Sequence, residues 1–314
     1  MYITGGVGSS KENEGFTGDY DLPNDSAYCE TCASVGMVYW NHRMNLLHMK
    51  SAYADILERS MYNGALAGVA LDGRKFFYVN PLSADGTHNR KEWYDCSCCP
   101  TQISRFIPSI GNYVYATDEN SIYVNLYISG ISDIVLGNGS VKLTQKTQYP
   151  WEGSVNIIVE PQNVTRFGVK LRFPGWCKSA SVKLNKTYVH DIEVRDGYIC
   201  LEKEWIFGDT INVDFDMPVE MVHSDPRVKV NQGRVAMQRG PIVYCFEEID
   251  NVKELDDIIL GTDVKKITEY RSELLGGVIV ITVKNGDRTY TAVPYYSWNN
   301  REPGSMQVWV KEDK

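Results

Sequence analysis

The chain has 314 residues, which is enough for two or three domains that each bury a core. Its net charge of −8, without a block of Lys or Arg, argues against binding to a nucleic-acid backbone, which needs concentrated positive charge. The chain has no apolar run close to the ~20 residues that span a bilayer and no apolar segment behind a basic start, so we expect a soluble chain without a membrane anchor.

The first third of the chain has helical periodicity. Over residues 25–71, apolar residues recur at three- and four-residue steps, which predicts at least two helices with a break near residues 48–51. One apolar stripe consists of Ala54, Leu57, Met61 and Ala65. Asn24 or Asp25 is expected to cap the first helix.

A turn and a third helix complete this region. Asp72 and Gly73 form a turn before an extended run at 76–79, and Pro100 suits the start of a short helix that continues through Phe106. These few helices cannot bury all of their faces alone. They are therefore expected to belong to a larger helical barrel or bundle.

Strand patterns replace the helical pattern near residue 112. Alternation with period two predicts strands at 113–115, 122–127, 155–159, 169–173, 198–201 and 211–215, which is typical of an antiparallel sandwich. Pro218 and the region of Pro226 separate these from strands at 235–237, 243–245, 277–283 and 289–293, which predict a second β-domain. The expected domains are therefore 1–112, 113–220 and 221–314.

The eight cysteines are unevenly distributed. Cys177, Cys200 and Cys245 are scattered through the predicted sheets and are interpreted as buried thiols. The other five lie in the first hundred residues, at positions 29, 32, 96, 98 and 99. Because the adjacent Cys98 and Cys99 could pair only in a strained ring, a metal site or a nucleophile is a better explanation for them than a disulfide.

Glu30 and Cys32 offer a second pair of ligands for a metal. Residues two apart on an α-helix lie ~200° around its axis, so this segment must be extended or turning if both bind one ion. Zinc prefers such thiolate and carboxylate ligands. The spacing alone supports a metal site and buried structural thiols equally.

Several long strings resemble the bacterial β-L-arabinofuranosidases of the zinc-cysteine glycoside hydrolase group. They are YITGGVGSSKENEGF (2–16), YDLPNDSAYCETCAS (20–34), ADILERSMYNG (54–64), DGRKFFYVNPL (72–82), CSCCP (96–100), LRFPGWC (171–177), RVAMQRGPIVYC (234–245) and AVPYYSWNNREPGSMQVWV (292–310). The resemblance implies a multidomain α+β fold: the C-terminal part of an (α/α)6 barrel, followed by two antiparallel β-sandwich domains.

The resemblance also implies roles for individual residues. The implied ligands of a Zn²⁺ ion are Glu30, Cys32, Cys98 and Cys99. Cys98 is the implied nucleophile and Glu14 the implied general acid/base, while Glu58 and Tyr78 contact the sugar or support the site. For Glu58 the alternative is a carboxylate that is ion-paired with Arg59 or another cation.

The implied reaction is a two-step displacement that releases β-L-arabinofuranose, with retention, from plant-type arabinose-containing glycans. Zinc would hold Cys98 as a thiolate, and the formal charge of −2 on the metal and its four ligands would favour a protonated Glu14. The competing mechanism uses zinc as a Lewis acid with bound water, but a closed shell of four ligands argues against it.

The resemblance covers only the later part of the family's catalytic domain, and the five histidines are interpreted as structural or surface residues. Two hypotheses follow: a truncated but active glycosidase, or an inactive fragment that serves as a zinc-containing structural or carbohydrate-binding module. In either case the exposed helix faces are expected to pair, in a homodimer or with the missing N-terminal portion. A bacterial cytoplasm and a periplasm are both compatible with metal-bound thiols.

Overall fold

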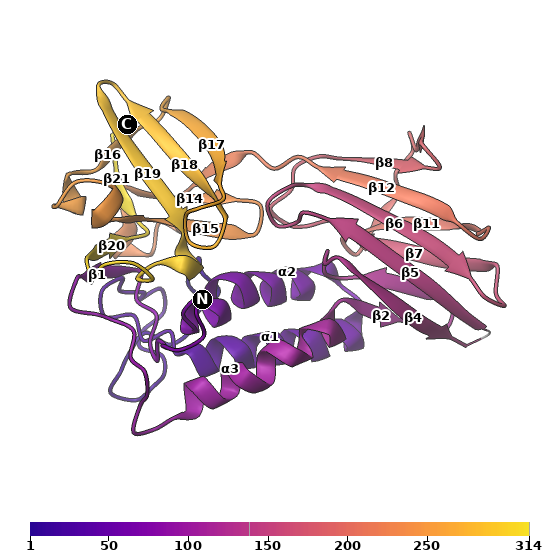
Figure 1. Ribbon diagram of the computed structural model, residues 1–314, viewed down its shortest axis with the longest axis horizontal. Coiled ribbons are helices and arrows are strands. Elements are labelled where there is room, and N and C mark those ends of the chain that lie inside the picture. Colours follow the sequence, from indigo (N-terminus) through magenta and orange to yellow (C-terminus); the bar gives the residue numbers. More distant parts are fainter. Residues whose placement is uncertain (138, 314) are drawn as a thin grey trace. The chain divides into compact units, whose positions relative to one another are not determined.

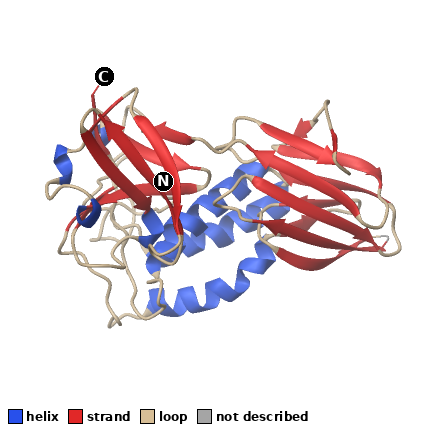
Figure 2. Ribbon diagram, turned by 45° about the horizontal axis from the view of Figure 1, so that its top comes forward, coloured by secondary structure: helices blue, strands red, loops and turns tan. Residues whose placement is uncertain are grey.

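The computed structural model describes residues 1–137 and 139–313, which are mostly β-structure with three α-helices (Figures 1 and 2). The contacts divide the chain into two compact units. The first unit comprises Met1–Val38, Arg59–Ile107 and Val219–Lys314, and the second comprises Tyr39–Glu58 and Pro108–Pro218. The C-terminal segment thus groups with N-terminal residues, which the linear pattern does not reveal; the three domain limits stay a prediction.

The predicted break between two helices is confirmed. Helix α1 spans Thr31–His48 and helix α2 spans Ser51–Arg59, and Met49 between them has a left-handed backbone with φ of 50°. Helix α3 spans Cys98–Ser109, which confirms the short helix predicted through Phe106, but it begins two residues before Pro100. No helix of the described residues is long and apolar enough to cross a membrane.

The predicted start of the first helix is wrong. Helix α1 begins at Thr31, so neither Asn24 nor Asp25 caps it. The preceding residues cannot continue the helix because Cys29 has φ of 35° and Glu30 forms an isolated antiparallel bridge with Val79. Tertiary pairing with a distant segment therefore overrides the apolar periodicity of this stretch.

One sheet of ten strands lies in the first unit. Its strands are β1 (Ser83–Asp85), β13 (Val219–Val222), β14 (Arg234–Arg239), β15 (Ile242–Glu247), β16 (Ile259–Gly261), β17 (Lys265–Arg271), β18 (Val278–Asn285), β19 (Arg288–Pro294), β20 (Ser305–Gln307) and β21 (Val310–Asp313). The main path runs β16-β21-β14-β15-β19-β18-β17. The expected wholly antiparallel order is wrong here, because β16 pairs with β21 in parallel.

Two sheets form the β-structure of the second unit, with orders β10-β11-β7-β3-β2 and β4-β5-β6-β12-β8-β9. The strands are β2 (Tyr115–Thr117), β3 (Ser121–Val124), β4 (Gly130–Leu136), β5 (Gly139–Thr147), β6 (Ser154–Pro161), β7 (Arg166–Arg172), β8 (Ala180–Leu184), β9 (Thr187–Tyr188), β10 (Val194–Arg195), β11 (Tyr198–Glu204) and β12 (Asp209–Phe215). β3 and β7 pair in parallel, which again corrects the antiparallel expectation.

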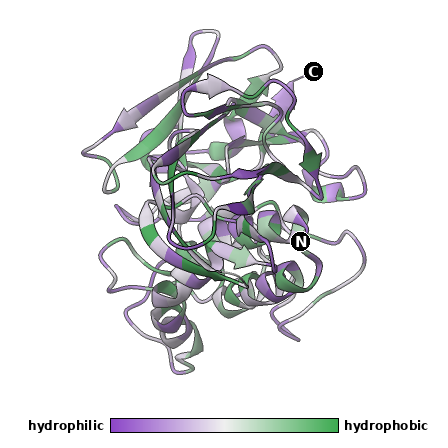
Figure 3. Cartoon of the chain, turned by 90° about the vertical axis from the view of Figure 1, so that its right-hand side faces the viewer, coloured by the Kyte–Doolittle hydropathy of each residue, from purple (hydrophilic) through white to green (hydrophobic). Residues whose placement is uncertain are grey.

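Alternation of apolar and polar residues accounts for the strands that were predicted, each of which overlaps an observed one. In β6, for example, Val155, Ile157 and Val159 are fully buried between more exposed neighbours. Figure 3 shows this interleaving of hydrophobic and hydrophilic residues along the strands. β4 was missed because its Ile131 and Val135 are exposed, so its pattern does not mark a buried face.

Candidate metal centre and active site

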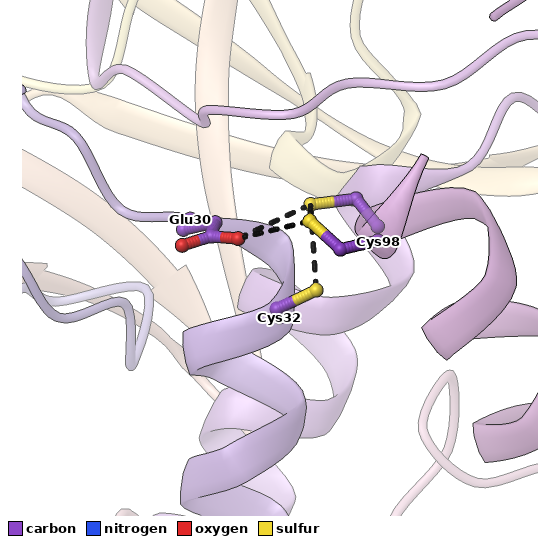
Figure 4. A group of neighbouring side chains, drawn as sticks. Glu30, Cys32 and Cys98 are labelled. Atoms are coloured by element: carbon purple, nitrogen blue, oxygen red, sulfur yellow. Dashed lines mark hydrogen bonds between the residues drawn. The ribbon is translucent and has the colours of Figure 1, made fainter. Parts of the chain in front are cut away.

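Two helix N-termini in the first unit bring together the four residues that the sequence proposed as metal ligands (Figure 4). Glu30 lies in the extended segment just before α1, and Cys32 lies in the first turn of that helix. Cys98 and Cys99 are the first two residues of α3. The requirement that the Glu30–Cys32 segment be extended or turning is met, because the helix begins between these two residues.

The four ligand atoms form one compact cluster in which all lie within 4.8 Å of one another. The Sγ atoms of Cys32 and Cys99 are 3.5 Å apart, and those of Cys98 and Cys99 are 3.8 Å apart. Glu30 Oε1 lies 3.4 Å from Cys98 Sγ and 3.6 Å from Cys99 Sγ.

These separations fit the donor set of a tetrahedral zinc site. With Zn–S distances of about 2.3 Å and Zn–O distances of about 2.0 Å, a tetrahedron has sulfur–sulfur edges of about 3.8 Å and sulfur–oxygen edges of about 3.5 Å. The measured distances match both values within 0.3 Å or less. Three thiols and one carboxylate are also the ligand types that zinc prefers. The residues present therefore fit the metal that the sequence implied.

The pKa values of the thiols and the absence, among the described residues, of a protein cation beside Glu30 are also consistent with a metal site. Burial raises the pKa of Cys32 to about 12, and burial also raises the pKa of Cys99 well above its ordinary value. Among residues 1–137 and 139–313, no Lys, Arg or His forms an ion pair with Glu30. The protein thus supplies no cation here, and a divalent metal would displace thiol protons when it binds.

Tyr78 lies directly beside Cys98. Its hydroxyl is 3.0 Å from Cys98 Sγ and 3.9 Å from Sγ of the exposed Cys96. The hydrogen bond with Cys98, and then burial, raise the pKa of Tyr78 above its ordinary range. The backbone carbonyl of Tyr78 accepts a hydrogen bond from the N–H of Thr31 at 2.9 Å, which fixes Tyr78 against the start of α1.

Glu14 is connected to this site by a second tyrosine. The hydroxyl of Tyr28 donates to Glu14 Oε1 at 3.0 Å, and its ring centroid is 6.4 Å from that of Tyr78. Burial and the bond to Glu14 raise the pKa of Tyr28 above its ordinary range. Glu14 and Cys98 therefore each contact one member of a tyrosine pair. Sequence reasoning missed Tyr28, although it lies only two residues before Glu30.

Glu58 has different surroundings, within the second unit. Its side chain is 1% exposed and forms an ion pair with Arg172, which is fully buried. It also accepts hydrogen bonds from Tyr149 at 2.6 Å and from Trp176 Nε1 at 3.3 Å. These contacts match the alternative interpretation of Glu58, an ion pair with a cation. The cation is Arg172. A contact between Glu58 and sugar stays a prediction.

Comparison with known proteins gives consistent matches along the chain. Three family models match: the GH127 catalytic domain of β-L-arabinofuranosidases at residues 1–112, the GH127 middle domain at 121–217 and the family 127 C-terminal domain at 219–311. The curated "Non-reducing end beta-L-arabinofuranosidase" of Bifidobacterium longum subsp. longum is 36% identical over 99% of this chain and 53% of its own length.

Solved structures agree with these matches. A GH127 β-L-arabinofuranosidase from Geobacillus stearothermophilus T6 is 42% identical, with a TM-score of 0.95 over 100% of this chain and 54% of that one. A second GH127 β-arabinofuranosidase structure is 40% identical, with a TM-score of 0.95 and the same coverage. The chain thus spans about half the length of the relatives that it matches.

Proposed function

Because the chain belongs to the glycoside hydrolase family 127 β-L-arabinofuranosidases, we propose that it carries the catalytic centre of a retaining hydrolase that releases β-L-arabinofuranose from arabinose-containing glycans. The observation that carries the proposal is the position of Cys98. Its sulfur lies in the cluster with Glu30, Cys32 and Cys99 and also contacts Tyr78, the neighbour of the Glu14–Tyr28 pair.

Glu30, Cys32, Cys98 and Cys99 would hold a zinc ion. When bound, the ion would keep the three thiols deprotonated at neutral pH and fix their positions. The short separations between these donors support this part of the proposal, since they are close to the edge lengths of a zinc tetrahedron.

Cys98 is the proposed nucleophile. Cys99 is fully buried, whereas Cys98 is partly exposed, so Cys98 is the better candidate of the two for contact with a sugar. Cys98 also begins α3, where the helix dipole stabilises negative charge. In the first step a Cys98–anomeric carbon bond forms as the bond to the leaving oxygen breaks. In the structure the Cys98 thiol donates to the Tyr78 hydroxyl; once Cys98 is deprotonated, that hydroxyl would donate to the thiolate in turn and orient it.

Glu14 is the proposed general acid and base. It would protonate the leaving oxygen in the first step and remove a proton from water in the second, when water displaces Cys98 from the anomeric carbon. Tyr28 would hold the carboxyl group in place through its hydrogen bond to Oε1. The left-handed backbone of Glu14, with φ of 50°, turns the loop of residues 10–15 back on itself, and Ser10 and Gly15 form a bridge there.

The three helices are proposed to be part of an (α/α)6 barrel, and the sheets to form the β-sandwich domains that accompany it. Helix α1 exposes large apolar side chains, with Trp40 at 60% and Leu47 at 72% exposure, one above the other at a seven-residue spacing. Ile107 on α3 is 44% exposed. Such faces are typical of helices that pack against further helices.

Hydrolysis of an aryl β-L-arabinofuranoside tests the function, and mass spectrometry tests the route. A pentosyl adduct on the Cys98 peptide, trapped by rapid acid quenching, is the expected result. Hydrolysis with a pre-steady-state burst but without any adduct on that peptide would contradict the covalent role of Cys98.

A further inference from the structure

A cavity of about 770 Å³ lies in the first unit beside Tyr28, the hydrogen-bond partner of the proposed acid/base. Tyr28, whose hydroxyl donates to Glu14, forms part of its wall, and so does Val79, the chain neighbour of Tyr78. The volume falls in the range of about 300–1,000 Å³ that is usual for small-molecule sites. The cavity is therefore large enough for sugar units, and Tyr28 connects its wall to Glu14, which would protonate a leaving group. Glu14 and Cys98 themselves do not line it.

The walls of the cavity are held by regular structure. Strand β1 pairs with strand β20, and this ladder brings Ser83 opposite Gln307 and Asp85 opposite Ser305, all four of which line the cavity. His88, another lining residue, places Nε2 3.1 Å from the carbonyl oxygen of Val79. The cavity is thus built from paired backbone segments and not from a single loop.

The polar groups around the cavity are mainly hydrogen-bond acceptors. Five carboxylates and two ammonium groups line it, which leaves a formal excess of three negative charges, one of which, on Asp256, is offset by an ion pair with Arg234 outside the lining. They are Asp25, Asp85, Glu248, Glu254, Asp256, Lys11 and Lys253. Gln307 adds a further acceptor: its Oε1 is buried without a hydrogen-bond partner, although its Nε2 donates to Asp256 at 3.2 Å.

We propose that this cavity is the subsite for the leaving-group part of the glycan, and that it accepts neutral, hydroxyl-rich saccharide units and rejects units that carry a carboxylate. The inference rests on the proposed function, since a general acid stands beside the scissile oxygen and the departing sugar lies next to it. Sugar hydroxyls donate to the lining acceptors, including Gln307 Oε1, whereas a uronate meets the excess negative charge.

Binding to the full chain tests the subsite without hydrolysis. The probes are neutral α-linked arabinotriose, which has no β-L-arabinofuranosyl bond to hydrolyse, and trigalacturonate, which we would titrate by isothermal calorimetry. We expect arabinotriose to bind at least about tenfold more tightly, and the ratio to shrink as salt screens the charges. Equal affinity for both probes, or no detectable affinity for arabinotriose, would overturn the proposal.

Two substitutions place the binding in the cavity. Ala84→Trp inserts a large ring from the lining of β1 and should weaken arabinotriose binding at least about tenfold. Its control is Ala180→Trp on β8 in the second unit. Because a large ring at position 84 could disturb the fold, a second substitution is needed. Glu254→Lys reverses a charge at an exposed lining residue.

Glu254→Lys should bring the affinities for the two probes closer by several-fold, whereas Glu269→Lys on strand β17, away from the cavity lining, should leave their ratio unchanged. An unchanged ratio in Glu254→Lys, together with unchanged binding in a folded Ala84→Trp variant, would place the ligand elsewhere.

The outcomes separate the subsite from the catalytic proposal. If the chain hydrolyses an aryl β-L-arabinofuranoside but Ala84→Trp leaves arabinotriose binding intact, the subsite is wrong and the catalytic proposal stands. If arabinotriose binds and both substitutions act as expected while no hydrolysis occurs, the subsite stands and the catalytic proposal fails.

Discussion

Two acidic sites in this protein, one fully buried and one partly buried, differ in how the negative charge of the carboxylate is compensated. In the second unit, the carboxylate of Glu58 is compensated by the guanidinium of Arg172, which also pairs with Asp55 at 2.7 Å. In the first unit, Glu30 lies among three thiols, and no Lys, Arg or His of the described residues pairs with it. The Glu58 site contains a cationic side chain, whereas the Glu30 site contains four side chains that could bind a metal cation.

The difference separates two carboxylates to which the family resemblance gave different roles, Glu30 as a metal ligand and Glu58 as a residue that contacts the sugar or supports the site. A carboxylate whose hydrogen bonds all go to protein donors, as those of Glu58 do to Tyr149, Trp176 and Arg172, is suited to holding a fold together. A carboxylate that faces Cys98 and Cys99 at 3.4–3.6 Å is suited to sharing a metal with them. The predictions below test this contrast, in order of decreasing effect.

Replacement of Cys98 is expected to have the largest effect. Cys98→Ser should lower kcat/KM for an aryl β-L-arabinofuranoside by at least about a thousandfold, because a serine hydroxyl is a far weaker nucleophile than a thiolate. Steady-state kinetics measure the loss, and Cys200→Ser, in the second unit, is the control that should keep full activity. A Cys98→Ser enzyme within tenfold of the original would contradict the nucleophile assignment.

Breaking the ion pair of the second unit should destabilise the fold. Arg172→Met leaves Glu58 buried without its cation and should lower the free energy of unfolding by about 3–5 kcal/mol. Urea denaturation measures the change. Arg227→Met removes an arginine from an exposed ion pair with Asp225 and should leave the urea midpoint unchanged. Equal midpoints for both variants would mean that Glu58 does not depend on Arg172.

Removal of the Tyr28 hydroxyl should act on catalysis and not on stability. Tyr28→Phe deletes the hydrogen bond to Glu14 and should lower kcat by about 10- to 100-fold, as expected for a lost bond to a carboxyl group worth about 1.5–3 kcal/mol. The loss should be greatest for substrates with poor leaving groups, since these need the acid most. A uniform loss across leaving groups would argue against an action through Glu14.

The smallest expected effect concerns pH and Asp209 in the second unit. Burial of Asp209 opposes ionisation, but hydrogen bonds from the backbone of Ile206, from Lys203 and from Asn185 outweigh it and lower the pKa. A lowered folded-state pKa means that the ionised form adds stability above the unfolded pKa of about 3.9 and that this stability is lost as pH falls through the folded pKa.

Asp209→Asn should therefore lower the urea midpoint at pH 6, and its difference from the original protein should shrink as the pH falls below the unfolded pKa of about 3.9. The expected cost at pH 6 is about 1 kcal/mol. A constant difference between the two proteins over this pH range would show that the loss comes from packing and not from the charge of Asp209.

The sequence was informative about short-range features. The break at 48–51, helix α3 and the overlapping strands follow from apolar spacing and turn residues close in the chain. The four residues proposed as ligands lie together, and the geometric condition on the Glu30–Cys32 segment came from helix geometry alone; their role as ligands stays a prediction.

The features that could not be predicted depend on contacts between residues far apart in the sequence. The start of α1 depends on the bridge between Glu30 and Val79, which are 49 positions apart in the sequence. The local spacing of apolar residues carries no information about such a pairing. The cation for Glu58 is Arg172, whose sequence separation from it is 114. The role of Tyr28 became visible only when its hydroxyl was found against Glu14. The exposed apolar residues of β4 likewise hid a strand, because its pairing with β5 places Ile131 and Val135 on an open face.

Metal analysis of the purified chain tests the contrast between the two acidic sites most directly. Inductively coupled plasma mass spectrometry should find about one zinc per chain, lost in Cys99→Ala and retained in Cys200→Ser. If Arg172→Met also keeps its zinc, the acidic site of the second unit does not contribute to metal binding. A folded chain that contains no zinc, and gains none when it is supplied, would contradict the account.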